Sequence, residues 1–189
     1  MDIQINVPNG KSGDWIVESF EISEEDAKFN NMRAMFSPGQ RIVKPGIFKR
    51  LMRNSTVVMS NTPAEISDHL SFIYKAKKVK KILINGLGLG VALSEILKSD
   101  IVKSVTIIEK SKNVINLVSD TYKDNRINII NCDAFEFKPP KGKKYNVVWH
   151  DIWDYICKDN LKEMTKLHRK YGKRTDWQGS WCKELCKRY

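Results

Sequence analysis

The chain has 189 residues, of which 41% are hydrophobic, and a formal net charge of +11 at pH 7. That length suffices for one domain with a real core and a short appendage, and it excludes a second full domain. No apolar run approaches the length of a membrane span, and the first residues lack the basic-then-apolar layout of a secretory signal. We therefore expect a cytoplasmic protein with no membrane partner, and its four irregularly spaced cysteines predict free thiols and no metal site.

Residues 1–61 predict a small β-rich extension. Strand-like patterns cover residues 3–7 and 15–22 and are separated by a Pro-Asn-Gly turn. A helix start follows at Ser23, and the sequence Ser37-Pro38-Gly39 predicts its end. A last short strand is predicted at residues 56–60.

A helix signature opens the next segment, residues 62–160. Thr62 is the expected cap, Pro63 the first helical residue, and Glu65 the partner that closes a capping box. We expect His69 to take a surface or hydrogen-bonded structural role rather than a catalytic one. The apolar positions predicted to face the sheet from this helix are Ile66, Leu70 and Ile73.

From Lys81 onward, apolar strands alternate with amphipathic helices, which predicts a parallel sheet covered on both faces. The fold class expected is α/β, with a partial doubly wound, Rossmann-like sheet. The strands are predicted at residues 82–84, 105–108, 127–130 and 145–149, and the helices at residues 91–97, 112–122 and 161–171.

A glycine-rich turn follows the first of these strands. It reads Asn85-Gly86-Leu87-Gly88-Leu89-Gly90 and leads directly into a helix. Glycines let the backbone turn sharply and approach a ligand closely, and the helix N-terminus offers free N–H groups. Glu109 ends the second strand and Asp133 follows the third, so three strand ends point at one cleft.

These residues resemble those of the class I, Rossmann-type S-adenosylmethionine-dependent methyltransferases, and the layout is similar to short methyltransferase-like proteins of bacteriophages. The resemblance implies that Asn85, Gly86, Leu87, Gly88 and Gly90 hold the amino-acid end of S-adenosylmethionine, with Asn85 in place of the usual acid. It also implies that Glu109 binds the ribose and that Asp133 and Ala134 read the adenine. The strand order implied is 3-2-1-4, with the cleft between the first and fourth strands.

The reacting groups are expected after the fourth strand. There Asp151 would orient or deprotonate the acceptor, with His150 or Asp154 assisting. The structural alternative is that His150 and Asp151 satisfy backbone groups in a tight turn. The favoured function is methyl transfer from S-adenosylmethionine to an acceptor that the sequence does not identify, and the loop lacks the signature of amino-methylating DNA enzymes.

Two alternatives stay open. The chain is also similar to the spermidine synthases, because Asp151 and Asp154 have their Asp-x-x-Asp spacing and the N-terminal strands resemble their hairpin. Those aminopropyltransferases carry an aspartate in the glycine loop, where this chain has Leu89. The other alternative is a non-catalytic protein that binds the cofactor and acts through a basic surface.

Residues 161–189 form a basic segment for which helical structure is predicted. Trp177, Trp181 and Leu185 recur every four residues, which favours the buried face of a helix over bases stacked on exposed aromatic rings. Nucleic acid remains the alternative partner. Because only four core strands are predicted, either the N-terminal strands complete the sheet or its edge pairs with a second copy in a homodimer.

Overall fold

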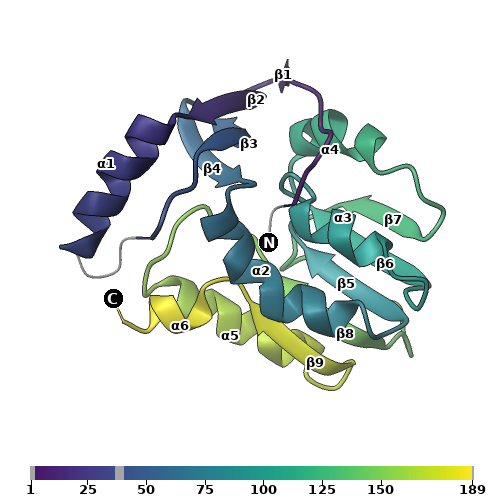
Figure 1. Cartoon of the computed structure of the whole chain (residues 1–189). Helices are drawn as coiled ribbons and strands as arrows, with labels where there is room; N and C mark the ends of the chain where they lie inside the picture. Colours follow the sequence, from purple (N-terminus) through teal and green to yellow (C-terminus); the bar gives the residue numbers. More distant parts are fainter. Residues whose placement is uncertain (1–2, 37–40, 189) are drawn as a thin grey trace.

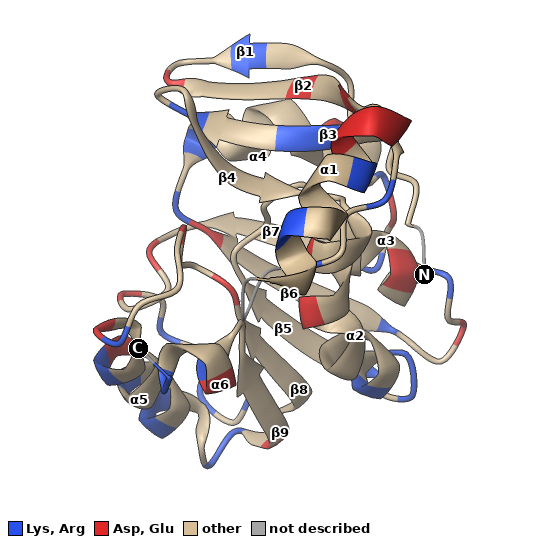
Figure 2. Cartoon of the chain, turned by 60° about the vertical axis from the view of Figure 1, so that its left-hand side comes forward, with Lys and Arg blue, Asp and Glu red and all other residues tan. Residues whose placement is uncertain are grey.

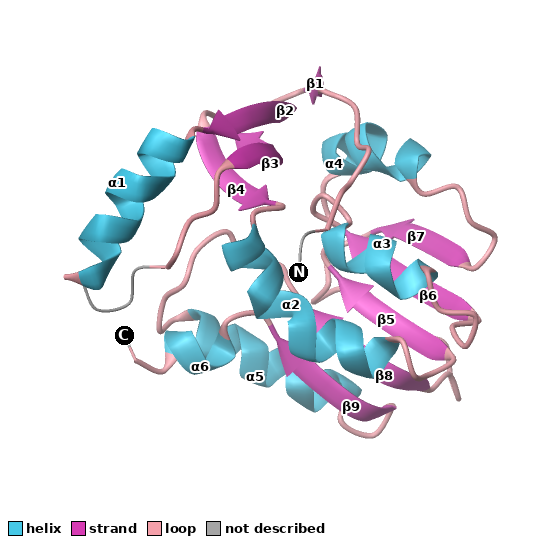
Figure 3. Ribbon diagram, in the orientation of Figure 1, coloured by secondary structure: helices cyan, strands magenta, loops and turns pink. Residues whose placement is uncertain are grey.

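The computed structural model describes residues 3–36 and 41–188, which form two sheets and six α-helices (Figures 1 and 3). The parallel sheet contains β5 (Lys81–Asn85), β6 (Ser104–Glu109), β7 (Ile127–Asn131), β8 (Tyr145–His150) and β9 (Thr175–Ser180). The antiparallel sheet contains β1 (Gly10–Ser12), β2 (Trp15–Ile22), β3 (Gly46–Arg53) and β4 (Thr56–Ser60). The helices are α1 (Glu24–Met35), α2 (Pro63–Ala76), α3 (Val91–Leu97), α4 (Lys112–Val118), α5 (Asn160–Tyr171) and α6 (Lys183–Cys186).

The parallel sheet has the order β7-β6-β5-β8-β9, and every neighbouring pair of strands is parallel. Its central strands are runs of buried apolar residues, as a sheet covered on both faces requires. The four strands expected from the sequence correspond to β7, β6, β5 and β8, with the crossover at β5. Among the described residues, no helix is long and apolar enough to cross a membrane.

Alternation along β8 assigns its last two side chains to opposite faces of the sheet. The Trp149 ring stacks on Phe72 of α2, with centroids 5.0 Å apart. The His150 ring faces the other way, toward His168 and Tyr171 of α5. Figure 1 shows the two layers that result, with α2 and α3 in front of the sheet and α5 behind it.

The N-terminal sheet differs from the prediction in two ways. Residues 3–7 are not a strand, although Ile3, Ile5 and Val7 are buried, and β3 was not predicted. β3 carries several basic residues and lies between β2 and β4; it pairs with β2 along its whole length and with β4 over residues 50–53, where the register shifts between Leu51 and Met52. α1 begins after Ser23 as expected, and its predicted end at residues 37–39 lies outside the described residues.

α2 begins at Pro63 as expected, but its first turn is organised differently. The Glu65 carboxylate does not close a capping box with Thr62; it accepts a hydrogen bond from the Ser60 backbone N–H at 2.6 Å and a second from the Ser60 hydroxyl. Leu70, predicted to face the sheet, is exposed, whereas His69 is only 1% exposed. The surface role considered for His69 is therefore wrong.

The prediction of a helical C-terminal segment is wrong for residues 175–180. They form β9, which pairs with β8 and extends the parallel sheet. Trp177 lies in this strand and stacks on Trp149, with ring centroids 6.3 Å apart. Neither the N-terminal strands nor a second copy is needed to cover β8, because a strand of the same chain does so.

Candidate active site

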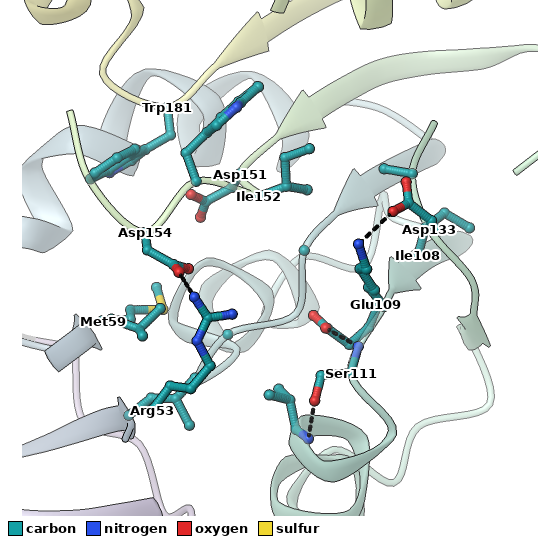
Figure 4. A pocket seen from close by; sticks show the side chains of 18 of the residues that line it. Arg53, Met59, Ile108, Glu109, Ser111, Asp133, Asp151, Ile152, Asp154 and Trp181 are labelled. Atoms are coloured by element: carbon teal, nitrogen blue, oxygen red, sulfur yellow. Dashed lines mark hydrogen bonds and ion pairs between the residues drawn. The ribbon is translucent and has the colours of Figure 1, made fainter. Parts of the chain in front are cut away.

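A cavity of about 320 Å³ lies where the carboxyl ends of the parallel strands meet the N-terminal sheet (Figure 4). The parallel sheet contributes the glycine loop after β5, the end of β6, and the loops that follow β7 and β8. β3 and β4 cover it from the other side through Leu51, Arg53, Val58 and Met59. Polar groups from separate strand ends thus converge on one pocket, as they do at the switch point of doubly wound sheets.

The glycine loop packs directly against other parts of the protein. Gly86 has φ +98°, and a Cβ placed there would lie 1.9 Å from the carbonyl oxygen of Asp151. Gly88 has φ +51°, and a Cβ there would lie 2.4 Å from Sδ of Met59. Both glycines line the cavity, so the loop is required for the close approach of Asp151 and Met59 as well as for a ligand.

Glu109 ends β6 with both carboxylate oxygens oriented by backbone donors. Oε2 accepts from the Leu87 N–H at 2.8 Å and Oε1 from the Ser111 N–H at 2.7 Å. Burial raises the pKa of Glu109, and these backbone hydrogen bonds act in the opposite direction. Each oxygen keeps a lone pair for a ligand hydroxyl, so the group fits the diol of a ribose.

Asp133 and Ala134 lie beside Glu109 in the wall of the cavity. Asp133 accepts the backbone N–H of Phe135 at 2.8 Å and pairs with Lys110 at 2.9 Å. The loop is therefore held in one conformation next to the proposed ribose site.

Asp151 lies at the centre of a cluster of ionisable groups. Its backbone N–H donates to the Asn85 carbonyl at 2.8 Å, which continues the β5–β8 pairing by one residue. Its carboxylate lies 3.8 Å from Nδ1 of His69, and Glu65 lines the same cavity one helical turn away. Burial, together with the negative charges of Asp68 and Glu109, raises the pKa of Asp151 to about 7.

Asp154 projects from the same loop and forms an ion pair with Arg53 of β3. The Arg53 guanidinium also lies over the Trp15 ring, 5.3 Å from its centroid. Through this contact the N-terminal sheet holds the loop that carries both aspartates. The sequence shows the aspartates but not Arg53, because the pairing joins residues that are far apart in the chain.

His150 and Asn85 are both fully buried and do not line this cavity. Nδ2 of Asn85 lies 2.8 Å from Nδ1 of His150, on the face of the sheet that α5 covers. Burial lowers the pKa of His150 to about 3, so the ring is neutral near pH 7. The structure therefore places His150 away from Asp151, in a buried polar network beneath the strand end.

Glu65 and His69, like Arg53, line the cavity and were missed by sequence reasoning. Both His69 ring nitrogens are buried without a hydrogen-bond partner among the described residues. The available signal was their spacing of four on one helix, which places them on the same face. That face could be assigned to the pocket only once the helix was packed against the end of β8.

Comparison with known proteins identifies a family. The spermine/spermidine synthase domain model matches residues 65–171, more than half of the chain. Polyamine aminopropyltransferase of Buchnera aphidicola is 26% identical over 133 residues, covering 64% of this chain and 46% of the relative. Polyamine aminopropyltransferase 2 of Bacillus anthracis is 38% identical over 85 residues, covering 40% and 24%. The chain thus spans less than half the length of these relatives.

Solved structures with a similar fold include S-adenosylmethionine-dependent methyltransferases. The enzyme from Mesorhizobium loti is 11% identical, with a TM-score of 0.41 over 55% of this chain and 48% of that one. The plantazolicin methyltransferase BpumL, solved with SAH, is 20% identical, with a TM-score of 0.42 over 58% and 44%. The family match covers the glycine loop, Glu109, Asp133 and both aspartates after β8. The chain belongs to the spermine/spermidine synthase domain family.

Proposed function

We propose that this protein transfers an aminopropyl group from decarboxylated S-adenosylmethionine to an amine. The observation that carries the proposal is the acidity of the pocket in a chain whose net charge is +11. Its only lysine or arginine neighbours among the described residues are Arg53 and Lys110, and each is paired with a carboxylate. The carboxylates that line it are Glu65, Glu109, Asp133, Asp151, Asp154 and Glu163.

A pocket of this charge favours cationic ligands. A polyamine carries ammonium groups, and the decarboxylated donor carries an ammonium without the carboxylate of S-adenosylmethionine. Trp15, Trp153 and Trp181 also line the cavity, and their faces attract cations. Both donor and acceptor of aminopropyl transfer therefore fit the charge of the site better than a donor that bears a carboxylate.

The nucleoside part of the donor would be held by the residues predicted for S-adenosylmethionine. Glu109 would accept the ribose hydroxyls, the loop at Asp133 and Ala134 would contact the adenine, and Gly86 and Gly88 would leave space for the donor's arm. This assignment keeps Gly86, Gly88, Glu109, Asp133 and Ala134 from the sequence analysis, leaves out Asn85, Leu87 and Gly90, which do not line the cavity, and changes the donor.

Leu89 was the sequence argument against aminopropyl transfer. Its side chain is fully buried and does not line the cavity. Glu65 does line it, and its carboxylate is fixed by two hydrogen bonds from Ser60, the residue that follows Met59. The Met59 sulfur in turn accepts the Leu89 N–H at 3.3 Å. We propose that Glu65 supplies the negative charge for the donor's ammonium group that Leu89 cannot supply.

Asp151 would act as the base. It takes a proton from the acceptor ammonium, and the freed amine nitrogen forms a bond to the aminopropyl carbon attached to sulfur. The carbon–sulfur bond breaks as the carbon–nitrogen bond forms, and its electron pair stays on sulfur, which loses its positive charge. A pKa of about 7 suits Asp151 to this role, because a base works best when its pKa lies near the operating pH.

The test offers the purified chain either donor, decarboxylated S-adenosylmethionine or S-adenosylmethionine, with a panel of diamines and polyamines. Mass spectrometry of the products identifies which group is transferred. With decarboxylated S-adenosylmethionine we expect methylthioadenosine and an aminopropylated amine. With S-adenosylmethionine we expect no methylated amine. Methylation of an amine with S-adenosylmethionine alone would replace this proposal with methyl transfer.

Replacing Asp151 tests the role of the base. Asp151→Asn should reduce turnover by about 10² to 10⁴, the usual contribution of a positioned base, while donor binding by calorimetry changes little. The matched control is Asp120→Asn, because Asp120 is exposed and outside the pocket. Equal losses of binding and turnover in Asp151→Asn would instead place Asp151 among the donor-binding groups.

A further inference from the structure

A second concave surface lies at the opposite end of the parallel sheet from the acidic pocket. It is a groove of about 450 Å³ between the loop before β8 and the chain that joins α5 to β9. We call it the basic groove and define it by its cations, Lys143, Lys144, Arg169, Lys170, Lys173 and Arg174. Figure 2 shows Lys and Arg positions along α5, one of the elements that form it.

The topology of the sheet builds the groove. β8 and β9 are parallel neighbours, so the loops that precede them meet at the same edge. The Tyr145 N–H donates to the Arg174 carbonyl at 2.8 Å, and the Arg174 guanidinium donates to the Pro140 carbonyl at 3.2 Å. Two segments separated in sequence are thus fixed side by side, which the sequence pattern of the basic tail did not reveal.

Five of the six cations divide into two groups by their contacts, and the sixth, Arg169, is exposed on α5. Lys170 and Arg174 hold the backbone, since Lys170 donates to the carbonyls of Ala134 and Phe135 at 2.8 and 2.9 Å. Lys143, Lys144 and Lys173 are exposed, and none of them forms an ion pair with a carboxylate of the described residues. Close spacing of unpaired like charges is unfavourable unless an anion is shared among them.

The lining narrows the class of anion. Among the described residues, no carboxylate and no aromatic or aliphatic side chain lines the groove. It therefore has no ring on which a base could stack and no apolar side chain that could insert into a bilayer. Its cations line both walls, so they can contact consecutive phosphates of one strand. Trp177 and Trp181 are also withdrawn from this surface, since Trp177 stacks on Trp149 and Trp181 lines the acidic pocket.

We propose that the basic groove binds the phosphate backbone of a nucleic acid without reading its sequence. The groove shares no lining residue with the acidic pocket, and the two are in contact through Lys170, which donates to the carbonyls of Ala134 and Phe135 in the pocket wall. Binding to backbone phosphates releases counterions, so the affinity must fall steeply as salt rises.

Fluorescence anisotropy of the full chain with a labelled 20-base-pair DNA duplex and a labelled single-stranded RNA tests the proposal. The logarithm of the association constant should fall with the logarithm of salt concentration with a slope of about −3 to −5 on duplex DNA, as expected if three to five cations each neutralise a phosphate. Duplexes of unrelated sequence should bind equally.

The variant Lys143→Glu, Lys144→Glu, Lys173→Glu should weaken binding at least about tenfold near 0.1 M salt and flatten the salt slope. The matched control, Lys11→Glu, Lys28→Glu, Lys112→Glu, changes the net charge equally at exposed positions outside the groove. Circular dichroism confirms that both variants are folded. Equal weakening in the two variants would overturn the proposal, since net charge alone would then explain binding. No salt-dependent binding, or preference for phosphatidylserine vesicles over duplex DNA, would overturn it too.

Discussion

The carboxylate of Asp151 and the imidazole of His69 face each other at 3.8 Å beside the acidic pocket. Burial lowers the pKa of His69, although the carboxylates of Asp68 and Glu65 act in the opposite direction. The neutral imidazole of His69 is a polar group beside the Asp151 carboxylate. It partly solvates that carboxylate, whereas the rest of its surroundings raise the pKa of Asp151. We therefore assign His69 as a positioning residue that acts through Asp151.

Replacing His69 with leucine should raise the pKa of Asp151 further, because an apolar side chain solvates a carboxylate less well. The rising limb of the pH–rate profile should then move to higher pH, and turnover at pH 7 should fall several-fold while donor affinity stays the same. His69→Gln, which keeps a polar group, should move the profile less. An unchanged profile in His69→Leu would show that the histidine only fills space beneath Trp149.

Several residues that line the acidic pocket could be predicted from single strand ends. The glycine loop, Glu109 and Asp133 each follow an apolar run, and parallel strands bring such positions together whatever the packing of the helices. His150 and His69 could not be assigned in this way. Which of two adjacent residues faces the pocket depends on the register of β8, and the environment of a helical residue depends on which face packs against the sheet.

At the scale of elements, β5 to β8 were predictable because each is rich in apolar residues and bounded by turns. β9 was not, because its sequence Thr-Asp-Trp-Gln-Gly-Ser has no apolar run and its tryptophan lies four residues before the next one. β3 was missed because its apolar and basic residues come in pairs, so the segment shows neither an apolar run nor the alternation of a half-buried strand. Arg50 pairs with Glu18 across the sheet and Arg53 with Asp154, so these charges are explained only by tertiary contacts.

The junction of the glycine loop and the β8 loop gives a prediction at this scale. Gly86→Ala would require a positive φ of an alanine and would push its Cβ against the backbone carbonyl of Asp151. We expect the free energy of unfolding, measured in urea, to fall by well over the roughly 1 to 2 kcal/mol that a left-handed alanine costs by itself. Donor binding in any folded fraction should also be lost.

Gly142→Ala is the matched control for that substitution. Gly142 also has a positive φ, +77°, but nothing lies within 4 Å of an added Cβ. Gly142→Ala therefore measures the cost of the backbone conformation alone, without the overlap with the Asp151 carbonyl that Gly86→Ala adds. Similar destabilisation by the two variants would mean that the β8 loop can move away from Gly86, and that Asp151 is held less firmly than its contacts indicate.

At the scale of the whole molecule, opposite charges occupy opposite ends of the parallel sheet. The acidic pocket lies at the carboxyl ends of the strands and the basic groove at the amino ends of β8 and β9. A net charge of +11 therefore does not describe the surroundings of the reacting groups. β9 covers β8 but is itself the edge strand of the parallel sheet, so the homodimer expected from an open edge stays a prediction. Sedimentation of the full chain at several concentrations tests it directly.

The stability of the molecule should depend on pH through Asp151. Its folded pKa, about 7, lies above the ordinary value of 3.8, so the folded state holds more protons than the unfolded state between these values. The contribution of Asp151 to stability therefore falls as pH rises from about 4 to about 7 and stays low above that range. Asparagine cannot ionise, so Asp151→Asn should avoid this loss.

Urea unfolding of both proteins at pH 4.5 and pH 8 measures the effect, and groups common to both, such as His150, cancel in the comparison. We expect Asp151→Asn to be close to wild type at pH 4.5 and more stable at pH 8, by on the order of 2 kcal/mol. Such a gain, together with the loss of turnover in the same variant, would identify Asp151 as a partly desolvated charge that serves the reaction and lowers the stability of the fold. If the difference in unfolding free energy between Asp151→Asn and wild type were the same at both pH values, the carboxylate would not be desolvated in the folded protein.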